Sequence, residues 1–257
     1  MDFPVNQFKK TLREGKPLIG LWSSLSSAAA TEILADSGFD WILIDTEHAP
    51  NETPMVADQL RAASLGTASP VVRPAWNDQV ILKRLLDIGV QTLLVPFVQS
   101  AEEAARAVAA TRYPPRGMRG VASVHRANRY GRTPDYFKRA DDEMCVLVQL
   151  ETRAAVDALE AIAAVDGIDG LFIGPSDLAA SLGHLGNNGH PEVRQTIEQA
   201  FRRAQAVGKP IGILAPLESD ARAYIDMGFA FVAVGSDVVV LRNGCDSLVK
   251  MFKGSSK

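Results

Sequence analysis

The chain has 257 residues, of which 47% are hydrophobic and 22% charged, and its formal net charge at pH 7 is −3. Basic side chains are scattered except between Arg112 and Arg139, so the sequence excludes a dedicated nucleic-acid binder, which would carry a basic face. No apolar run reaches the roughly 18 residues of a membrane span, and the charged N-terminus lacks a signal-peptide core. We therefore expect a cytoplasmic protein without membrane contact.

Short apolar runs alternate with longer amphipathic segments along the whole chain. The segment MDFPVNQFKKTLREGK predicts an N-terminal helix. Eight runs rich in Val, Ile and Leu then predict buried parallel strands, at 17–23, 40–45, 69–74, 92–98, 145–151, 170–175, 209–215 and 231–236. Helical patterns separate them, at 28–37, 52–64, 78–87, 101–111, 153–163, 191–207, 218–226 and 238–252. Eight repeats without a break in composition predict an α/β fold, a single (β/α)₈ TIM barrel over residues 1–257.

Local signals support this register. Gly89, Gly208 and Gly228 each fall between a helix and the next strand, where a left-handed C-cap is expected. The irregular stretch at 111–136 is too long for an ordinary connection, which predicts a functional role. We expect Cys145 and Cys245 to be reduced and buried, because each lies in an apolar or helical pattern.

Two acidic residues stand where adjacent predicted strands end. Glu151 ends the fifth strand, beside Gln149, and Asp177 follows the sixth. The carboxyl ends of barrel strands carry the reacting groups, and two unpaired carboxylates this close would repel each other unless a divalent cation lay between them. The oxygen donors favour Mg²⁺ or Mn²⁺, with Co²⁺ and Zn²⁺ as alternatives. Glu151 as an ion-pair partner of Arg73, and Asp177 as a helix N-cap, remain open as alternatives.

Other polar residues fall at the same ends of neighbouring strands. Asp45, Glu47 and His48 follow the second strand, where a carboxylate can orient the imidazole for proton transfer; a surface histidine without function is the alternative. Arg73 ends the third strand and can stabilise a keto oxygen, an enolate or a carboxylate, unless it only pairs with a nearby acid. The turn formed by Gly174, Pro175 and Ser176 can hold a substrate carboxylate.

Several chemistries are excluded by what the sequence lacks. An imine-forming aldolase needs a buried lysine inside the barrel, but Lys209 opens its strand at the wrong end and Lys83 lies in a predicted helix. No dinucleotide, P-loop or nucleophile-elbow motif is present. The segments APLES and VGSD offer little glycine for a phosphate, so we expect an unphosphorylated substrate.

The motifs IDTEHAP, VVRPAWND, LLVPFVQ, RYPPRGMRG, VQLET, LFIGPSDL and FVAVGSD together resemble the HpcH/HpaI family of class II pyruvate-dependent aldolases, over nearly the whole chain. The resemblance implies that Glu151 and Asp177 bind the metal and that Gln149 belongs to its water shell. It also implies that Asp45 and His48 form the acid-base pair, while Arg73 stabilises the pyruvate enolate. The remaining substrate-binding residues that it implies are Gly174, Pro175, Ser176 and Leu214.

The resemblance further implies an activity and an assembly. The activity is the reversible cleavage of 4-hydroxy-2-oxo acids, such as 4-hydroxy-2-oxoheptanedioate, to pyruvate and an aldehyde, here succinate semialdehyde, in aromatic compound catabolism. The assembly is a homohexamer built from trimers, in which Asp87 and the long stretch reach a neighbouring subunit.

Two other functions stay open. One is a lyase acting on a coenzyme A thioester, of the malyl-CoA or citrate lyase type, against which the short chain argues. The other is a non-catalytic barrel that binds oxo acids, against which the presence of both His48 and Arg73 argues.

Overall fold

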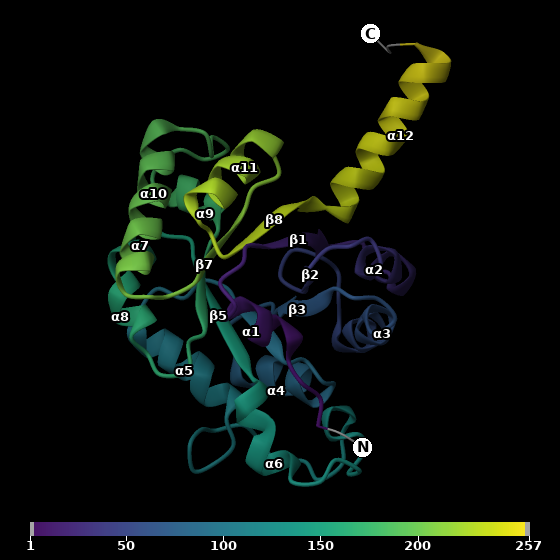
Figure 1. Cartoon of the computed structure of the whole chain (residues 1–257), viewed down its shortest axis with the longest axis vertical. Helices are drawn as coiled ribbons and strands as arrows, with labels where there is room; N and C mark the ends of the chain where they lie inside the picture. Colours follow the sequence, from purple (N-terminus) through teal and green to yellow (C-terminus); the bar gives the residue numbers. More distant parts are fainter. Residues whose placement is uncertain (1–2, 255–257) are drawn as a thin grey trace.

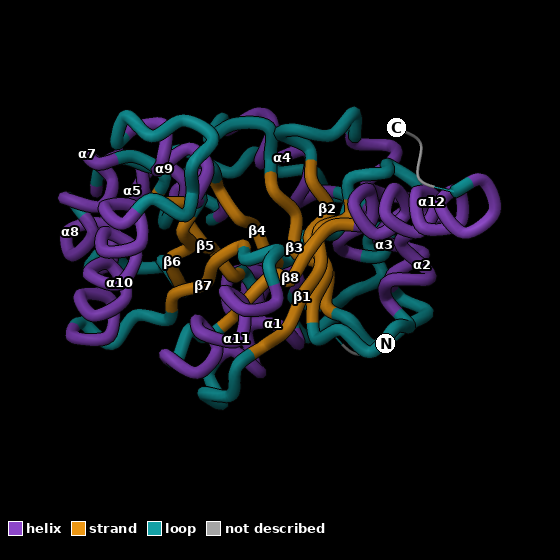
Figure 2. Tube along the Cα trace, turned by 90° about the horizontal axis from the view of Figure 1, so that it is seen from above, coloured by secondary structure: helices purple, strands orange, loops and turns teal. Residues whose placement is uncertain are grey.

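The protein is described by a computed structural model over residues 3–254. Its eight strands are parallel and close into a barrel, each pairing with the next along the chain and β8 with β1 (Figure 2). This confirms the predicted TIM barrel. The strands are β1 (Leu18–Ser23), β2 (Trp41–Asp45), β3 (Ser69–Arg73), β4 (Thr92–Val95), β5 (Cys145–Leu150), β6 (Gly170–Ile173), β7 (Ile211–Leu214) and β8 (Phe231–Ser236).

Helices surround the strands, and the predicted N-terminal helix is present as α1 (Gln7–Leu12) (Figure 1). The predicted helix at 153–163 is divided into α7 (Arg153–Asp157) and α8 (Leu159–Ala163). The other helices between strands are α2 (Ala28–Ala35), α3 (Thr53–Ala63), α4 (Gln79–Asp87), α5 (Ala101–Thr111), α9 (Pro175–Ser181), α10 (Pro191–Ala206) and α11 (Glu218–Met227). The last helix, α12 (Asp237–Lys253), extends away from the barrel (Figure 1).

Aromatic side chains fill the barrel interior. The rings of Trp41 and Phe231 pack with their centroids 5.9 Å apart. Phe8 of α1 closes the end of the barrel where the strands begin, with its ring centroid 5.7 Å from that of Phe231. Gly20 gives Trp41 its space, because a Cβ there would lie 2.2 Å from the indole. Since this interior is solid and apolar, polar side chains gather at the two ends of the barrel. We call the end where the strands finish the carboxyl rim.

Local details confirm some predictions and correct others. Gly89, Gly208 and Gly228 have φ of 102°, 66° and 107°, the left-handed conformation predicted for them. Strand β4 is shorter than predicted, because Pro96 has no N–H to donate and Phe97 has φ of 55°. Both cysteines are free and Cys145 is buried, but the predicted burial of Cys245 is wrong: it lies exposed on α12, which extends away from the barrel.

The long irregular stretch lies at the end of the barrel opposite the carboxyl rim. It contains a 3₁₀ turn, η1 (Arg126–Asn128), and leads into α6 (Tyr136–Arg139) and η2 (Ala140–Glu143) just before β5. Phe3, Tyr113 and Tyr136 anchor it in a small apolar cluster of its own. Within residues 3–254 no helix is both long and apolar enough to cross a membrane.

Candidate active site

A buried ion pair joins the ends of β2 and β3 at the carboxyl rim. Asp45 stands directly opposite Arg73 in the parallel register, so the two side chains emerge side by side. The Arg73 Nε donates to Asp45 Oδ1 at 2.8 Å and its Nη2 donates to Oδ2 at 2.7 Å. Glu47 adds a second acid, with Oε2 2.9 Å from Nη1. The alternative that Arg73 pairs with a nearby acid is therefore observed, and the pairing fixes the guanidinium at the rim.

The expected contact between Asp45 and His48 is not observed among the described residues. Both Asp45 oxygens are taken by Arg73, and Oδ1 also accepts the backbone N–H of Glu47 at 3.0 Å. His48 lies beyond the strand in the following turn, where its side chain is 66% exposed and its Nε2 is 3.9 Å from Glu47 Oε2. The acid beside His48 is thus Glu47, because Asp45 belongs to the strand itself and faces Arg73.

Glu151 is a buried carboxylate directly after β5. Its Oε1 accepts the backbone N–H of Phe97 at 2.7 Å, and its Oε2 accepts Gln149 Nε2 at 2.6 Å. Burial raises the pKa of Glu151 to about 7 against the lowering effect of the Phe97 hydrogen bond, and the charges of Glu47 and Asp177 raise it further. Among the described residues no basic side chain lies within 4.0 Å of it, so the predicted alternative of an ion pair with Arg73 is not observed.

Phe97, whose N–H binds Glu151, has a strained backbone conformation. A φ of 55° is uncommon for a bulky residue and costs about 1 to 3 kcal/mol, so it persists only where the surroundings enforce it. Here the conformation points the Phe97 N–H at Glu151, while the phenyl ring packs 5.8 Å from that of Trp76. The strain is thus tied to holding Glu151 in place.

Asp177 lies on the neighbouring strand end, in the first turn of α9. Gly174, not Asp177, is the N-cap of this helix, so the predicted alternative that Asp177 caps it is not observed. Asp177 is exposed and close enough to raise the pKa of both Glu47 and Glu151 by repulsion. The rim therefore holds three carboxylates near one guanidinium that is already paired with Asp45.

The donor set fits a hard divalent cation. Gln149 Oε1 is buried and has no hydrogen-bond partner within residues 3–254, although buried amide oxygens are normally satisfied. It lies beside Glu151, a buried carboxylate with no basic side chain within 4.0 Å among the described residues. Carboxylate and amide oxygens are the ligands and water acceptors that Mg²⁺ and Mn²⁺ prefer.

The other predicted site residues are spread more widely. Leu214 ends β7 and is half-buried, Pro175 begins α9, and the Ser176 hydroxyl accepts Asn188 Nδ2 at 3.0 Å. Asp87 ends α4 just before β4, at the opposite end of the barrel, where Arg119 Nη2 binds it at 3.0 Å. Within its own chain Asp87 therefore does not take part in the rim.

Two features of the site were not predicted as such. Glu47 follows a predicted strand end, and its place in IDTEH puts it beside the same rim, but nothing in the sequence joins it to Glu151 and Asp177. The role of Phe97 had no signal in the sequence, because it depends on a backbone conformation that aromatic residues rarely adopt.

Comparisons with known proteins agree with this geometry. Residues 18–244 match the family described as HpcH/HpaI aldolase/citrate lyase. The chain is 55% identical to a "Pyruvate aldolase" of Rhizobium etli, over 98% of this chain and 99% of that protein. It is 53% identical to a "5-keto-4-deoxy-D-glucarate aldolase" of Salmonella arizonae, over 98% of each.

A solved structure shares the whole architecture. It is that of an HpcH/HpaI aldolase/citrate lyase family protein from Burkholderia cenocepacia, which superposes with a TM-score of 0.92 at 42% identity. The match covers 96% of this chain and 99% of that one. The chain therefore belongs to the HpcH/HpaI aldolase/citrate lyase family, and it is a carbon-carbon lyase of the aldolase type.

Proposed function

We propose that this aldolase cleaves 4-hydroxy-2-oxo acids to pyruvate and an aldehyde, with a divalent cation held by Glu151 and Asp177. The observation that carries the proposal is the buried Glu151 carboxylate, which has two other carboxylates for neighbours and no cation within 4.0 Å among the described residues. A bound cation would replace repulsion by attraction at this point. Mg²⁺ or Mn²⁺ fits the oxygen donors better than Co²⁺ or Zn²⁺.

When bound, the cation supplies Lewis-acid polarisation of the 2-oxo group. The remaining work falls to side chains of the rim. Gln149 Oε1 is free to accept a hydrogen bond from water or substrate. Arg73 donates two N–H groups to Asp45, which hold its guanidinium in place. Its positive charge stabilises the negative charge that develops on the pyruvate-derived enolate.

His48 is the proposed general base. In cleavage its imidazole takes the proton of the C4 hydroxyl, the C3–C4 bond breaks, and the electron pair passes into the enolate of pyruvate. Protonation of the enolate at C3 then releases pyruvate. The exposure of His48 at the rim gives it access to substrate, and the neighbouring Glu47 carboxylate stabilises the imidazolium that forms.

Two acceptor aldehydes are candidates. Cleavage of 4-hydroxy-2-oxoheptanedioate would give succinate semialdehyde and place the enzyme in aromatic compound catabolism. The substrate in the name of the Salmonella relative, 5-keto-4-deoxy-D-glucarate, is also a 4-hydroxy-2-oxo acid when numbered from its other end. Its cleavage would give pyruvate and a hydroxyaldehyde acid, and the 53% identity favours it.

The test is metal-dependent release of pyruvate, followed with lactate dehydrogenase and NADH. Exhaustive chelation should abolish cleavage of both substrates, and Mg²⁺ or Mn²⁺ should restore it. Glu151→Gln should not be rescued, whereas Glu160→Gln, which changes an exposed acid on α8, should behave like the parent. Turnover that survives chelation would refute the metal proposal, and cleavage of coenzyme A thioesters alone would favour the other type of lyase.

We also propose that the protein is a homo-oligomer, for which a homohexamer is the expectation. Helix α12 leaves the barrel, yet Leu241, Leu248 and Phe252 on it are 55%, 56% and 85% exposed (Figure 1). A second copy that covered these apolar side chains would remove them from water.

A further inference from the structure

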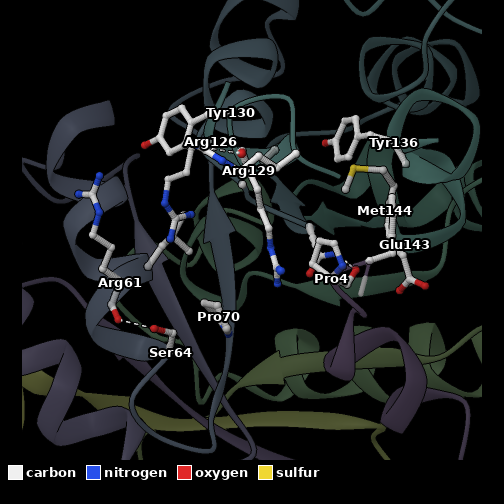
Figure 3. A pocket seen from close by; sticks show the side chains of 17 residues that line it. Pro4, Arg61, Ser64, Pro70, Arg126, Arg129, Tyr130, Tyr136, Glu143 and Met144 are labelled. Atoms are coloured by element: carbon white, nitrogen blue, oxygen red, sulfur yellow. Dashed lines mark hydrogen bonds between the residues drawn. The ribbon is translucent and has the colours of Figure 1, made fainter. Parts of the chain in front are cut away.

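A cavity lies at the end of the barrel opposite the carboxyl rim. Its volume is about 690 Å³, within the usual range for small-molecule sites. Pro70 at the start of β3, Gln91 before β4 and Met144 before β5 form part of its wall, and the long irregular stretch forms another part (Figure 3). Because the filled barrel interior separates the two ends, this cavity is not an extension of the active site.

Positive charge dominates the cavity. Four arginines line it, Arg61, Arg126, Arg129 and Arg132, against one acid, Glu143. Glu143 is already engaged, because its Oε2 accepts the backbone N–H of Asn6 at 2.7 Å. Arg61 pairs with Asp58, but within residues 3–254 no carboxylate lies within 4.0 Å of the other three guanidinium groups.

Arg126 is the most constrained of these cations. It is half-buried, and its Nη1 donates to the carbonyl of Ile88 at 2.6 Å. Gly89 leaves room for this guanidinium in its present position, since a Cβ there would lie 2.7 Å from Nη1. Burial, together with the nearby charge of Arg61, lowers the pKa of Arg126. A partly desolvated charge next to a like charge is unfavourable unless an anion compensates it.

The backbone that presents the neighbouring side chains is strained. Arg129 and Tyr130 have φ of 53° and 56°, two consecutive left-handed residues without glycine. Asn128 stabilises the turn, since its Oδ1 accepts the N–H of His125 at 3.1 Å and of Gly131 at 2.8 Å. Both strained residues line the cavity (Figure 3), and strain of this kind tends to persist where a ligand is bound.

We propose that this cavity, which we call the arginine pocket, is a second binding site for a small organic dianion, a phosphate monoester or a dicarboxylate. Guanidinium groups recognise both by paired N–H donors. Pro4, Pro70 and Met144 give the pocket an apolar wall for the carbon skeleton of the ligand. The ligand is bound without being converted, because the groups proposed for catalysis lie at the other end of the barrel.

Isothermal titration calorimetry on the intact, metal-free protein tests the proposal at low ionic strength. The probes are phenyl phosphate, inorganic phosphate and succinate, with phenol as the uncharged control. We expect the dianions to bind and phenol not to bind, and we expect affinity to fall as salt is added. Stronger binding of phenyl phosphate than of succinate would identify a phosphate ester as the ligand class, and the reverse order a dicarboxylate.

Variants locate the binding. Arg126→Gln and Arg129→Gln should each weaken binding at least about tenfold, since each removes a charged donor. The matched control is Arg202→Gln, which changes an arginine on α10 that is 77% exposed and pairs with Glu198, and it should bind like the parent. Circular dichroism melting identifies any variant that fails to fold, and Arg132→Gln then takes its place.

Three results would overturn the proposal. One is no binding of any dianion at millimolar concentrations. Another is equal binding by the parent and by folded Arg126→Gln and Arg129→Gln. The third is that Arg73→Lys loses dianion binding while Arg126→Gln and Arg129→Gln retain it, which would place the anion at the carboxyl rim instead.

Discussion

Gly174 and Glu151 are in such close contact that a Cβ on Gly174 would lie 2.6 Å from Glu151 Oε2. The same Cβ would stand 2.8 Å from Gln149 Nε2, so the backbone between β6 and α9 directly bounds the proposed metal site. The glycine at the start of the GPSD turn is therefore needed for space next to the carboxylate, independently of any contact with substrate.

Gly174→Ala should displace Glu151 and weaken Mg²⁺ or Mn²⁺ binding by at least about tenfold. The reason is that buried Glu151 cannot move without losing its hydrogen bonds to Phe97 and Gln149. Titration calorimetry with each metal measures the effect. Gly189→Ala is the matched control, because the nearest atoms to its Cβ are 3.9 Å away. Equal metal affinities in the two variants would contradict the role of Gly174.

The metal-free protein should lose stability as the pH rises. The pKa of Glu151 is raised from 4.5 to about 7, so the folded state binds this proton more tightly than the unfolded state. The free energy of unfolding should therefore fall between about pH 4.5 and pH 7, by roughly 3 kcal/mol, and level off above.

Urea denaturation of chelated protein across this pH range measures that loss. Glu151→Gln should remove the Glu151 contribution, and a saturating divalent cation should restore stability at high pH. The difference in unfolding free energy between the parent and Glu151→Gln gives the contribution of Glu151. If that contribution rose between about pH 4.5 and pH 7, the raised pKa of Glu151 would be contradicted.

Asp45→Asn should lower the free energy of unfolding by about 2 to 4 kcal/mol, because it removes the negative charge that pairs with the buried Arg73 guanidinium. Denaturation in urea measures the change. Glu218→Gln, which breaks an exposed pair with Arg222, should cost less than about 1 kcal/mol.

Of the two acids in the segment IDTEH, Asp45 and Glu47, Glu47 is the one beside His48. If Glu47 stabilises the imidazolium that forms in cleavage, Glu47→Gln should lower kcat for aldol cleavage, because that cation loses a neighbouring negative charge. Steady-state kinetics of the folded, metal-loaded variant measure the loss. An unchanged kcat would exclude Glu47 as the partner of His48.

His48→Gln should lower kcat for aldol cleavage by about 10² to 10⁴, the usual contribution of a positioned base. Metal affinity should be unchanged, which separates loss of the base from damage to the site. His184→Gln is the control, since His184 pairs with Glu192 on the surface between α9 and α10. Full activity of folded, metal-loaded His48→Gln would exclude it as the base.

The double variant Leu241→Asp/Leu248→Asp should convert the assembly into smaller species in sedimentation velocity. The two leucines are seven residues apart on α12, so they share one face of the helix and are both exposed in the single chain. Asn243→Asp adds charge on the same helix and should leave the assembly intact. Unchanged sedimentation of the double variant would show that α12 does not form the interface.

The sequence alone determined the fold and supplied the proposed members of the site. Strand and helix periodicity predicted the closed barrel because buried parallel strands are apolar on both faces, and strand ends identified Glu151, Asp177, Arg73 and His48. It also excluded an imine mechanism, and the structure agrees: Lys209 precedes β7 and its Nζ donates to the carbonyl of Ile168 at 2.6 Å.

Only the tertiary structure decided which side chains pair. The register of β2 and β3 sets Asp45 against Arg73 and leaves Glu47 for His48, a choice that nearby acids in one motif do not reveal. The strained backbone of Phe97, the contact between Gly174 and Glu151, and the arginine pocket likewise join residues distant in sequence. Periodicity reports which face of an element is buried, whereas pairing depends on register and close approach, which are fixed only when the barrel closes.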